Sequence, residues 1–494
     1  MRDRRYHDAY RLDLATGRPT LVAANPGDVT GWIADNRLRV RAATAMLPDG
    51  GTELRTRSGE GAEWKAVRRE SSDETFPTVA GFTPDDRGLW LLSSVDANAA
   101  RLLRMDAASG AATPLAGDSV FDATGVLVHP VRRTLQAVQF TRQRLEWQAM
   151  DSAVSADLRT LQRLRDGDFT IDSRDRADRK WIVTYVVSDG PVAYYLYDRP
   201  TRRASLLFVH RPALERYTMA KMEPVAFRAR DGLQLYGYLT LPVGREPKRL
   251  PTVMLVHGGP WARDVWGYHP EVQWLANRGY AVLQVNYRGS TGYGKAHLNA
   301  GDREWAGKMH TDLLDAKTWA VDRGYSDPDR ICIYGGSYGG YATLVGLAFT
   351  PGEFTCGVDV VGPSNLVTLL QTVPPYWAPY RAMLDKRLGR LQEEEFLRSR
   401  SPLFRADSIR APLLIVQGAN DPRVKQAESD QIVTAMRTRG RPVKYIVFPD
   451  EGHGFARPEN KLRFYAAAEP FLAEYLGGRL EPASQEEKIE PFVQ

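Results

Sequence analysis

Cysteine is almost absent from this chain of 494 residues. Only Cys332 and Cys356 occur, and both stand in apolar stretches that are typical of buried strands. The sequence therefore offers no disulfide framework and no cysteine metal site, and we expect two inert core thiols. The zinc-protease pattern HExxH is also missing, and the one GxxxxGK segment is followed by Ala296 where a phosphate-binding loop needs a hydroxyl. Neither a metal nor a cofactor is predicted.

Long apolar runs and long runs of one charge are missing as well. No window approaches the stretch of about 20 apolar residues that a membrane helix needs, and the N-terminus has no apolar leader core. We expect no membrane partner and, as the chain is written, a cytoplasmic location; a periplasmic or secreted one is expected only if Met1 is not the true start. The net charge of +6 is interleaved along the chain, so no nucleic-acid partner is predicted.

The N-terminal part of the chain consists of short β-type runs separated by turn residues, with almost no helical periodicity. Similar segment endings place Asp13, Asp106 and Asp198 at separations of 93 and 92 residues, and comparable endings lie near the midpoints. A repeat of about 46 residues with four strands is typical of a β-propeller blade. We predict a propeller of four to five blades over residues 1–222, with four full blades preceded by the last strand of another.

A propeller closes its ring to hide the edges of its strands. Because the predicted series begins at the end of a blade, we expect a ring that is open or incomplete at its N-terminus. Such a ring predicts either weak selection against long substrates or self-association through the N-terminal region. A homo-oligomer is therefore among the expectations.

From residue 223 onward, near-continuous apolar strands alternate with helical segments, as in TVMLVHGG, RICIYGGS, PLLIVQGAN and VKYIVFPDEG. Strands of this kind indicate a mostly parallel sheet that is covered on both faces. We predict a doubly wound α/β-hydrolase domain over residues 223–480 and a polar tail over residues 481–494.

Ser337 lies in the segment GGSYG, directly between the strand RICIY and a helix-like segment. This context is typical of a nucleophile elbow, after which an acid and a histidine follow on later strands. Asp421 follows PLLIVQG, and His453 follows VKYIVFP as the one histidine downstream of the serine. We predict a Ser337, Asp421, His453 triad. Asp450 and Glu451 are less favoured acids, because residues beside the histidine on its own loop rarely reach its Nδ1.

An oxyanion needs preorganised hydrogen-bond donors. One donor is expected to be the backbone N–H of Tyr338, next after the serine, and the other to come from the loop HGGP that begins at His257. His257 itself is expected to pack or to fix this loop rather than to act as a base.

Several of these segments resemble a known family. LVHGGPWARD, NYRGSTGYGK, GGSYGGY, QGANDPRV and EGHGF are similar to segments of the prolyl oligopeptidase family of serine peptidases, above all its branch of acylaminoacyl peptidases and dipeptidyl aminopeptidases. The resemblance implies the same triad, backbone oxyanion donors at Gly259 and Tyr338, and a propeller that admits only short peptides.

We therefore expect hydrolysis of short peptides through an acyl-enzyme. Because no pair of glutamates for holding a free N-terminus is recognisable in the propeller, acylaminoacyl or oligopeptidase activity is preferred to dipeptide release. A carboxylesterase with the same triad and an interaction protein with an inactive hydrolase domain stay open as alternatives. Tyr376, Trp377 and Tyr380 are candidates for the substrate pocket, with a role in the core or in a lid as the alternative.

Overall fold

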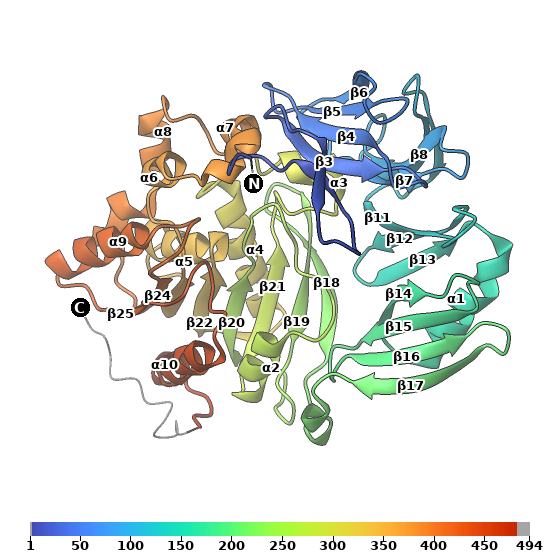
Figure 1. Ribbon diagram of the computed structural model, residues 1–494. Helices are drawn as coiled ribbons and strands as arrows, with labels where there is room; N and C mark the ends of the chain where they lie inside the picture. Colours follow the sequence, from blue (N-terminus) through green and yellow to red (C-terminus); the bar gives the residue numbers. More distant parts are fainter. Residues whose placement is uncertain (1, 482–494) are drawn as a thin grey trace.

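The computed structural model describes residues 2–481 and has two unlike parts (Figure 1). Several small antiparallel sheets come from the N-terminal part of the chain, and one large sheet flanked by helices comes from the rest. Apart from residue 481, the tail predicted for residues 481–494 lies outside the described residues. None of the helices between residues 2 and 481 is both long enough and apolar enough to cross a membrane.

The N-terminal strands are short, and each pairs antiparallel with its neighbours in sequence. A two-stranded sheet comes first, with β1 (Ala9–Leu12) and β2 (Pro19–Ala23). The next two sheets contain β3 (Val29–Ala34), β4 (Val40–Met46), β5 (Thr52–Thr56) and β6 (Lys65–Glu70), then β7 (Thr78–Phe82), β8 (Gly88–Ser93), β9 (Arg101–Asp106) and β10 (Ala112–Ala116). The last two contain β11 (Ala123–Val128), β12 (Leu135–Thr141) and β13 (Leu145–Ala149), then β14 (Asp168–Arg174), β15 (Lys180–Val186), β16 (Ala193–Asp198) and β17 (Arg203–Val209).

These sheets are propeller blades, and apolar clusters join each blade to the next. Leu54 packs with Leu89 across the first pair of four-stranded blades, and Trp90 packs with Phe140 across the following pair. The blade of β11–β13 has three strands, one fewer than the repeat predicts. The strand β17 ends the series at a sheet edge, with the side chain of Phe208 exposed.

Helix α1 (Ser152–Leu164) follows β13, in a part of the chain for which only short β-type runs were predicted. The Asp151 side chain caps its first turn by accepting a backbone N–H. Val154, Leu158 and Leu161 are buried at the spacing of one helix face. This spacing is a clear helical signal in the sequence, and the expectation of almost no helical periodicity was wrong here.

The second part is built on an eight-stranded sheet with the order β18-β19-β21-β20-β22-β23-β24-β25. Its strands are β18 (Met222–Arg228), β19 (Gln234–Thr240), β20 (Leu250–Val256), β21 (Ala281–Asn286), β22 (Ser326–Gly336), β23 (Cys356–Val360), β24 (Leu413–Gly418) and β25 (Val443–Phe448). The helices are α2 (Pro270–Asn277), α3 (Gly294–Asn299), α4 (Lys308–Asp322), α5 (Tyr338–Phe349), α6 (Leu366–Gln371), α7 (Arg381–Arg387), α8 (Glu394–Ser399), α9 (Gln426–Thr438) and α10 (Pro458–Leu476), with 3₁₀ turns η1 (Pro212–Arg216), η2 (Pro375–Tyr380) and η3 (Pro402–Ser408).

The strands from β20 to β25 run parallel, and helices cover both faces of the sheet as predicted. Helices α4, α5 and α9 pack on one face, and α2 and α10 pack on the other. Cys332 and Cys356 are both buried in this core as free thiols. The carboxyl ends of the parallel strands meet along one edge, which is where ligands bind in sheets of this kind.

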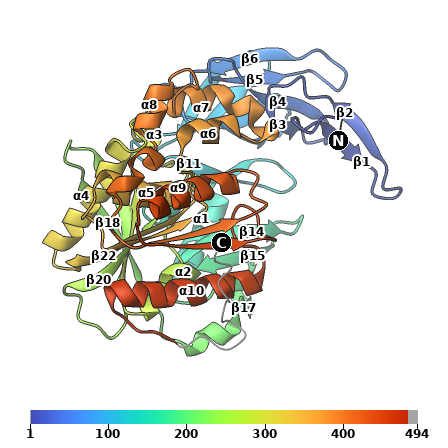
Figure 2. The same ribbon diagram turned by 90° about the vertical axis from the view of Figure 1, so that its left-hand side faces the viewer.

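A short turn of the propeller makes ion pairs with the helices of the second part. Lys386 on α7 lies 2.7 Å from the Asp73 carboxylate, and Lys295 on α3 lies 2.8 Å from that of Glu74. Figure 2 shows α6, α7 and α8 beside the blade of β3–β6. The helices that follow β23 therefore lie between the carboxyl edge of the large sheet and the propeller.

Candidate active site

Ser337 occupies the tight turn between β22 and α5. Its backbone has a φ of 57° and a ψ of −117°, a conformation that is uncommon outside glycine and typical of a nucleophile elbow. Glycines make the turn possible, because a Cβ on Gly339 would lie 2.0 Å from the carbonyl oxygen of Val256 on β20. The backbone N–H of Ser337 donates to the carbonyl oxygen of Val360 on β23 over 2.8 Å. The turn therefore packs against β20 and is hydrogen-bonded to β23.

The three residues predicted as a triad lie together. His453 Nε2 is 3.0 Å from Ser337 Oγ, and His453 Nδ1 is 2.7 Å from Asp421 Oδ2. A carboxylate only accepts, so Nδ1 donates to Asp421 and Nε2 is left to accept the hydroxyl proton of Ser337. Asp421 is 2% exposed, and its second oxygen accepts two backbone N–H groups of its own loop. The geometry is that of a serine nucleophile with an oriented base.

The two other acids beside the histidine have different partners. Glu451 accepts the backbone N–H groups of Ala456 and Arg457 and so shapes the loop, and Asp450 pairs with the Arg457 side chain at 3.0 Å. Both carboxylates therefore have partners other than His453.

The oxyanion loop lies directly on the elbow. A Cβ on Gly258 would be 3.4 Å from the Cβ of Ser337, and Gly259 has a φ of +121° that favours glycine. Gly259 and Tyr338 line one cavity of about 450 Å³ together with Ser337 and His453. Both residues predicted to supply oxyanion donors therefore lie at the cavity that contains the serine and the histidine.

The same cavity is otherwise mainly apolar. Trp377 and Tyr380 line it as the sequence predicted, whereas Tyr376 is not among its lining residues. The reason is the 3₁₀ turn η2, in which residues three apart share a face and the preceding tyrosine falls on another. The lining that sequence reasoning missed comes from several separate segments: Trp261, Trp305, Pro363, Leu369, Leu370, Val373, Met383, Leu384, Leu388, Arg423 and Val424.

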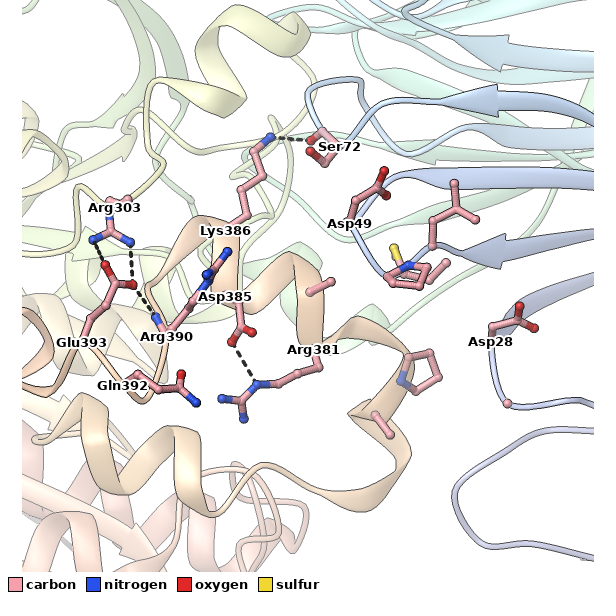
Figure 3. A pocket seen from close by; sticks show the side chains of 17 residues that line it. Asp28, Asp49, Ser72, Arg303, Arg381, Asp385, Lys386, Arg390, Gln392 and Glu393 are labelled. Carbon is pink, nitrogen blue, oxygen red and sulfur yellow. Dashed lines mark hydrogen bonds and ion pairs between the residues drawn. The ribbon is translucent and has the colours of Figure 1, made fainter.

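Residues of helix α7 line both this apolar cavity and a larger, more polar cleft of about 980 Å³. Figure 3 shows the larger cleft. Met383 and Leu384 line the cavity, while Arg381 and Asp385 line the cleft and form an ion pair at 2.9 Å. The cleft faces Asp28 and Asp49 of the propeller (Figure 3). None of the triad residues lines it, so the larger space is not where the predicted chemistry is assembled.

Two ionisable groups lie beside the elbow, one partly buried and the other without exposed surface. Burial lowers the pKa of His257, at the start of the oxyanion loop, to about 4. Burial also raises the pKa of Asp359, on β23 next to the elbow, to about 8. Both groups are therefore neutral at pH 7, and neither adds a fixed charge to the site.

A doubly wound sheet with a serine at the elbow and an aligned histidine and carboxylate defines the class of the α/β-hydrolases with a serine triad. Sequence comparison narrows this class, since the pattern of the prolyl oligopeptidase family matches residues 266–479. Dipeptidyl aminopeptidase BIII of Pseudoxanthomonas mexicana is 49% identical over 98% of this chain and 72% of its own length. Dipeptidyl peptidase family member 6 of Caenorhabditis elegans is 39% identical over 96% of this chain and 69% of its own. The chain belongs to the prolyl oligopeptidase family and is a serine peptidase.

Comparison of structures supports the same fold. A puromycin-hydrolyzing peptidase of Mycobacterium tuberculosis superposes with a TM-score of 0.78 over 95% of this chain and 73% of that one, at 22% sequence identity. An acylaminoacyl peptidase of Pyrococcus horikoshii gives a TM-score of 0.67 over 97% and 87%, at 18% identity. The predicted order of a propeller followed by an α/β-hydrolase domain is confirmed.

Proposed function

We propose that Ser337 is the nucleophile of a peptidase reaction that proceeds through an acyl-enzyme. Its Oγ attacks the scissile carbonyl carbon while His453 Nε2 takes the hydroxyl proton, and the N–H groups of Gly259 and Tyr338 stabilise the oxyanion. His453 then gives the proton to the leaving amine, and a water activated by the same nitrogen hydrolyses the ester. Asp421 holds the imidazole in the required tautomer. The alignment of the three side chains at 3.0 and 2.7 Å carries this proposal.

The size and the lining of the cavity indicate which class of substrate it can bind. Its volume of about 450 Å³ and its lining of tryptophan, leucine and methionine side chains suit a large apolar residue on the acyl side of the scissile bond. Trp377 and Tyr380 are the proposed specificity residues among those that the sequence singled out. Short peptides with an aromatic or long aliphatic residue at this position are therefore the first substrates to test.

The end preference is a further part of the proposal. The relatives with 49% and 39% identity are named for dipeptide release, and an acylamino-acid-releasing enzyme of Arabidopsis thaliana is 28% identical over 42% of this chain. We infer that the protein releases N-terminal dipeptides, and this activity is tested first. Acylaminoacyl release is the second activity to test. Matched substrates with a free and an acetylated N-terminus distinguish the two, and acyl esters measure the carboxylesterase alternative.

The nucleophile is tested by covalent labelling with a fluorophosphonate. We expect Ser337→Ala to lose both labelling and peptide hydrolysis while its circular dichroism and melting temperature stay near those of the wild type. Ser399→Ala, which changes an exposed serine on α8, is the matched control and should label fully. Full labelling of Ser337→Ala would remove this residue from the proposed role.

A further inference from the structure

The last strands of the blades differ in how their outer edges are protected. The turn of the next blade packs against β6, because a Cβ on Gly110 would overlap the carbonyl oxygen of Val67. In β10, Pro114 removes a backbone donor. In β13, the backbone N–H of Leu145 donates to the Asp168 carboxylate over 2.9 Å. Each of these features keeps an edge strand from pairing with another chain.

The last strand of the propeller, β17, has none of these features. Within residues 2–481 it is hydrogen-bonded to β16 alone, and Figure 1 shows it at the outer edge of its blade. The strand contains no proline, and after Arg203 it contains no charged residue. The backbone N–H and C=O groups that alternate residues direct away from β16 can therefore pair with an added strand.

Apolar side chains lie along this edge. Leu206 is 54% exposed and Phe208 is 57% exposed. The Phe208 ring is stacked on Tyr194 of β16 with the centroids 4.5 Å apart, so it is held in place although it is exposed. A bulge at Leu207 interrupts the register with β16 and leaves Arg203–Leu206 as the regular stretch. Because this stretch is short, a partner must contact the side chains as well as the backbone.

Arginines flank the apolar residues on both sides. Between residues 199 and 217 the sequence has five arginines and a single acid, Glu215. Arg202 and Arg203 precede the apolar residues and Arg211 follows them, and all three are exposed and without an ion pair in the described part of the chain. Antiparallel pairing of two copies of β17 would bring these like charges together, which disfavours a second copy of this chain. Acidic residues at both ends of a partner would be attracted instead.

Each feature of this edge indicates one property of its partner. Free N–H and C=O groups in a row match an extended polypeptide rather than a lipid or a nucleic acid. The exposed leucine and phenylalanine match apolar residues, and the arginines match acidic ones. We propose that β17 is a docking site for an extended peptide segment with an apolar centre and acidic residues on both sides, which adds to the last blade as a further strand.

This docking site is separate from the site of the proposed reaction. None of the residues 199–217 lines the cavity around Ser337 or the larger polar cleft. The segment is therefore a binding partner rather than the peptide that is cleaved, and the inference does not rest on the proposed function. Hydrolysis of a peptide anilide should be unchanged in every variant of β17.

A fluorescein-labelled peptide tests the proposal by fluorescence anisotropy. The probe has two glutamates at each end and alternating valine and threonine between them. All binding variants carry Ser337→Ala as well, and mass spectrometry checks that the probe stays intact. We expect saturable binding at low salt that weakens as the salt concentration rises. Absence of binding would overturn the proposal.

Matched substitutions locate the binding site. Leu206→Lys should lower the affinity by about tenfold or more, because the apolar contact is lost and a lysine on an edge opposes pairing. Leu115→Lys makes the same change at an exposed leucine of β10 and should leave the affinity unchanged. Equal affinities of the two variants would place the probe elsewhere and overturn the proposal.

A methylated probe distinguishes strand addition from a purely electrostatic contact. Methyl groups on the valine and threonine amides keep the charges and the side chains but remove the backbone donors. This probe should bind about tenfold or more weakly than the unmethylated one, and equal binding would overturn the proposal. Arg202→Glu should weaken binding of the acidic probe and favour a probe with lysines in place of the glutamates, a comparison that remains informative if Leu206→Lys does not fold.

Other occupants of the edge would give different results. Analytical ultracentrifugation might show a dimer that Leu206→Lys dissociates, which would assign the edge to a second copy of the chain. Binding to phosphatidylserine vesicles in place of the probe, lost in Arg202→Glu, would assign it to a lipid surface. Either result overturns the proposal.

Discussion

Asp35 of the propeller and Asp264 and Asp359 of the catalytic domain are partly or fully buried acids whose pKa values shift in opposite directions. In the propeller, Asp35 lies 2.7 Å from the Arg39 guanidinium; burial acts to raise the pKa of this acid, but the hydrogen bonds from Arg39 outweigh it and the pKa is lowered. In the catalytic domain, burial raises the pKa of Asp264 to about 7 and that of Asp359 to about 8, and neither acid has an ion pair in the described chain. The charged partner therefore favours the ionised form of Asp35, whereas burial without such a partner favours the protonated form of Asp264 and Asp359.

Asp421 is another buried acid of the catalytic domain, and it gives the largest expected effect. This acid is 2% exposed, and its charged partner would be His453 in the transition state rather than an arginine. We predict that Asp421→Asn lowers kcat by about 10⁴-fold, because an amide supports the wrong histidine tautomer. The measurement is steady-state hydrolysis of a peptide anilide. Asp450→Asn is the control on the neighbouring loop, and an equal loss there would reassign the acid.

The second prediction concerns the paired acids of the propeller. Asp178 is 3% exposed and accepts hydrogen bonds from Arg199 at 2.6 Å, from Gln136 on the preceding blade at 2.8 Å and from Trp181 at 2.7 Å. Removing one partner of such a buried pair leaves an uncompensated charge, so Asp178→Ala should lower the free energy of unfolding by about 3–5 kcal/mol. Guanidinium-induced unfolding measures this loss.

An exposed ion pair on the propeller surface provides the control for Asp178→Ala. Asp166 pairs with Arg144 at 3.4 Å, but its side chain is 87% exposed. Because water screens such a pair, Asp166→Ala should change the unfolding midpoint very little. If Asp178→Ala unfolds at the midpoint of the wild type, the ion pairs and the hydrogen bonds of Asp178 do not stabilise the propeller and the prediction is wrong.

The triad residues could be proposed from the sequence because each of them follows its own apolar strand. Ser337 comes after β22, Asp421 after β24 and His453 after β25, and parallel strands bring these ends to one edge. The propeller could be predicted because the sequences of its blades end in similar segments at a regular spacing. Both signals are local or periodic, and they need no knowledge of distant contacts.

The rest depends on contacts between segments that are far apart in sequence. Trp305 and Met383 reach the same cavity from different segments, and nothing in either segment indicates the other. Tyr376 was placed in the pocket because it adjoins two residues that do line it, and only the 3₁₀ geometry of η2 separates them. The protonation states of His257 and Asp359 follow from burial, which the sequence does not show.

The last prediction, and the sharpest test of the unpaired acids, is a pH dependence at Asp359. This residue has no exposed surface, its Oδ1 accepts the N–H of Gly362 over 2.8 Å, and its Oδ2 has no hydrogen-bond partner among residues 2–481. The folded protein should therefore hold this proton up to a pKa of about 8, while the unfolded chain loses it near the ordinary value of 3.8. Between these values the unfolded state binds fewer protons, so this group makes stability fall as the pH rises, by up to about 1.4 kcal/mol per pH unit.

Asp359→Asn removes this proton while keeping the shape of the side chain and an acceptor for Gly362. We expect the difference in melting temperature between variant and wild type to shift steadily in favour of the variant from pH 5 to pH 8 and to level off above that. Asp450→Asn, which changes an exposed acid on the loop before His453, should show a constant difference over the same range. Parallel curves for Asp359→Asn and the wild type would mean that this carboxyl is ionised in the folded protein, and the contrast between the two domains would then rest on Asp264 alone.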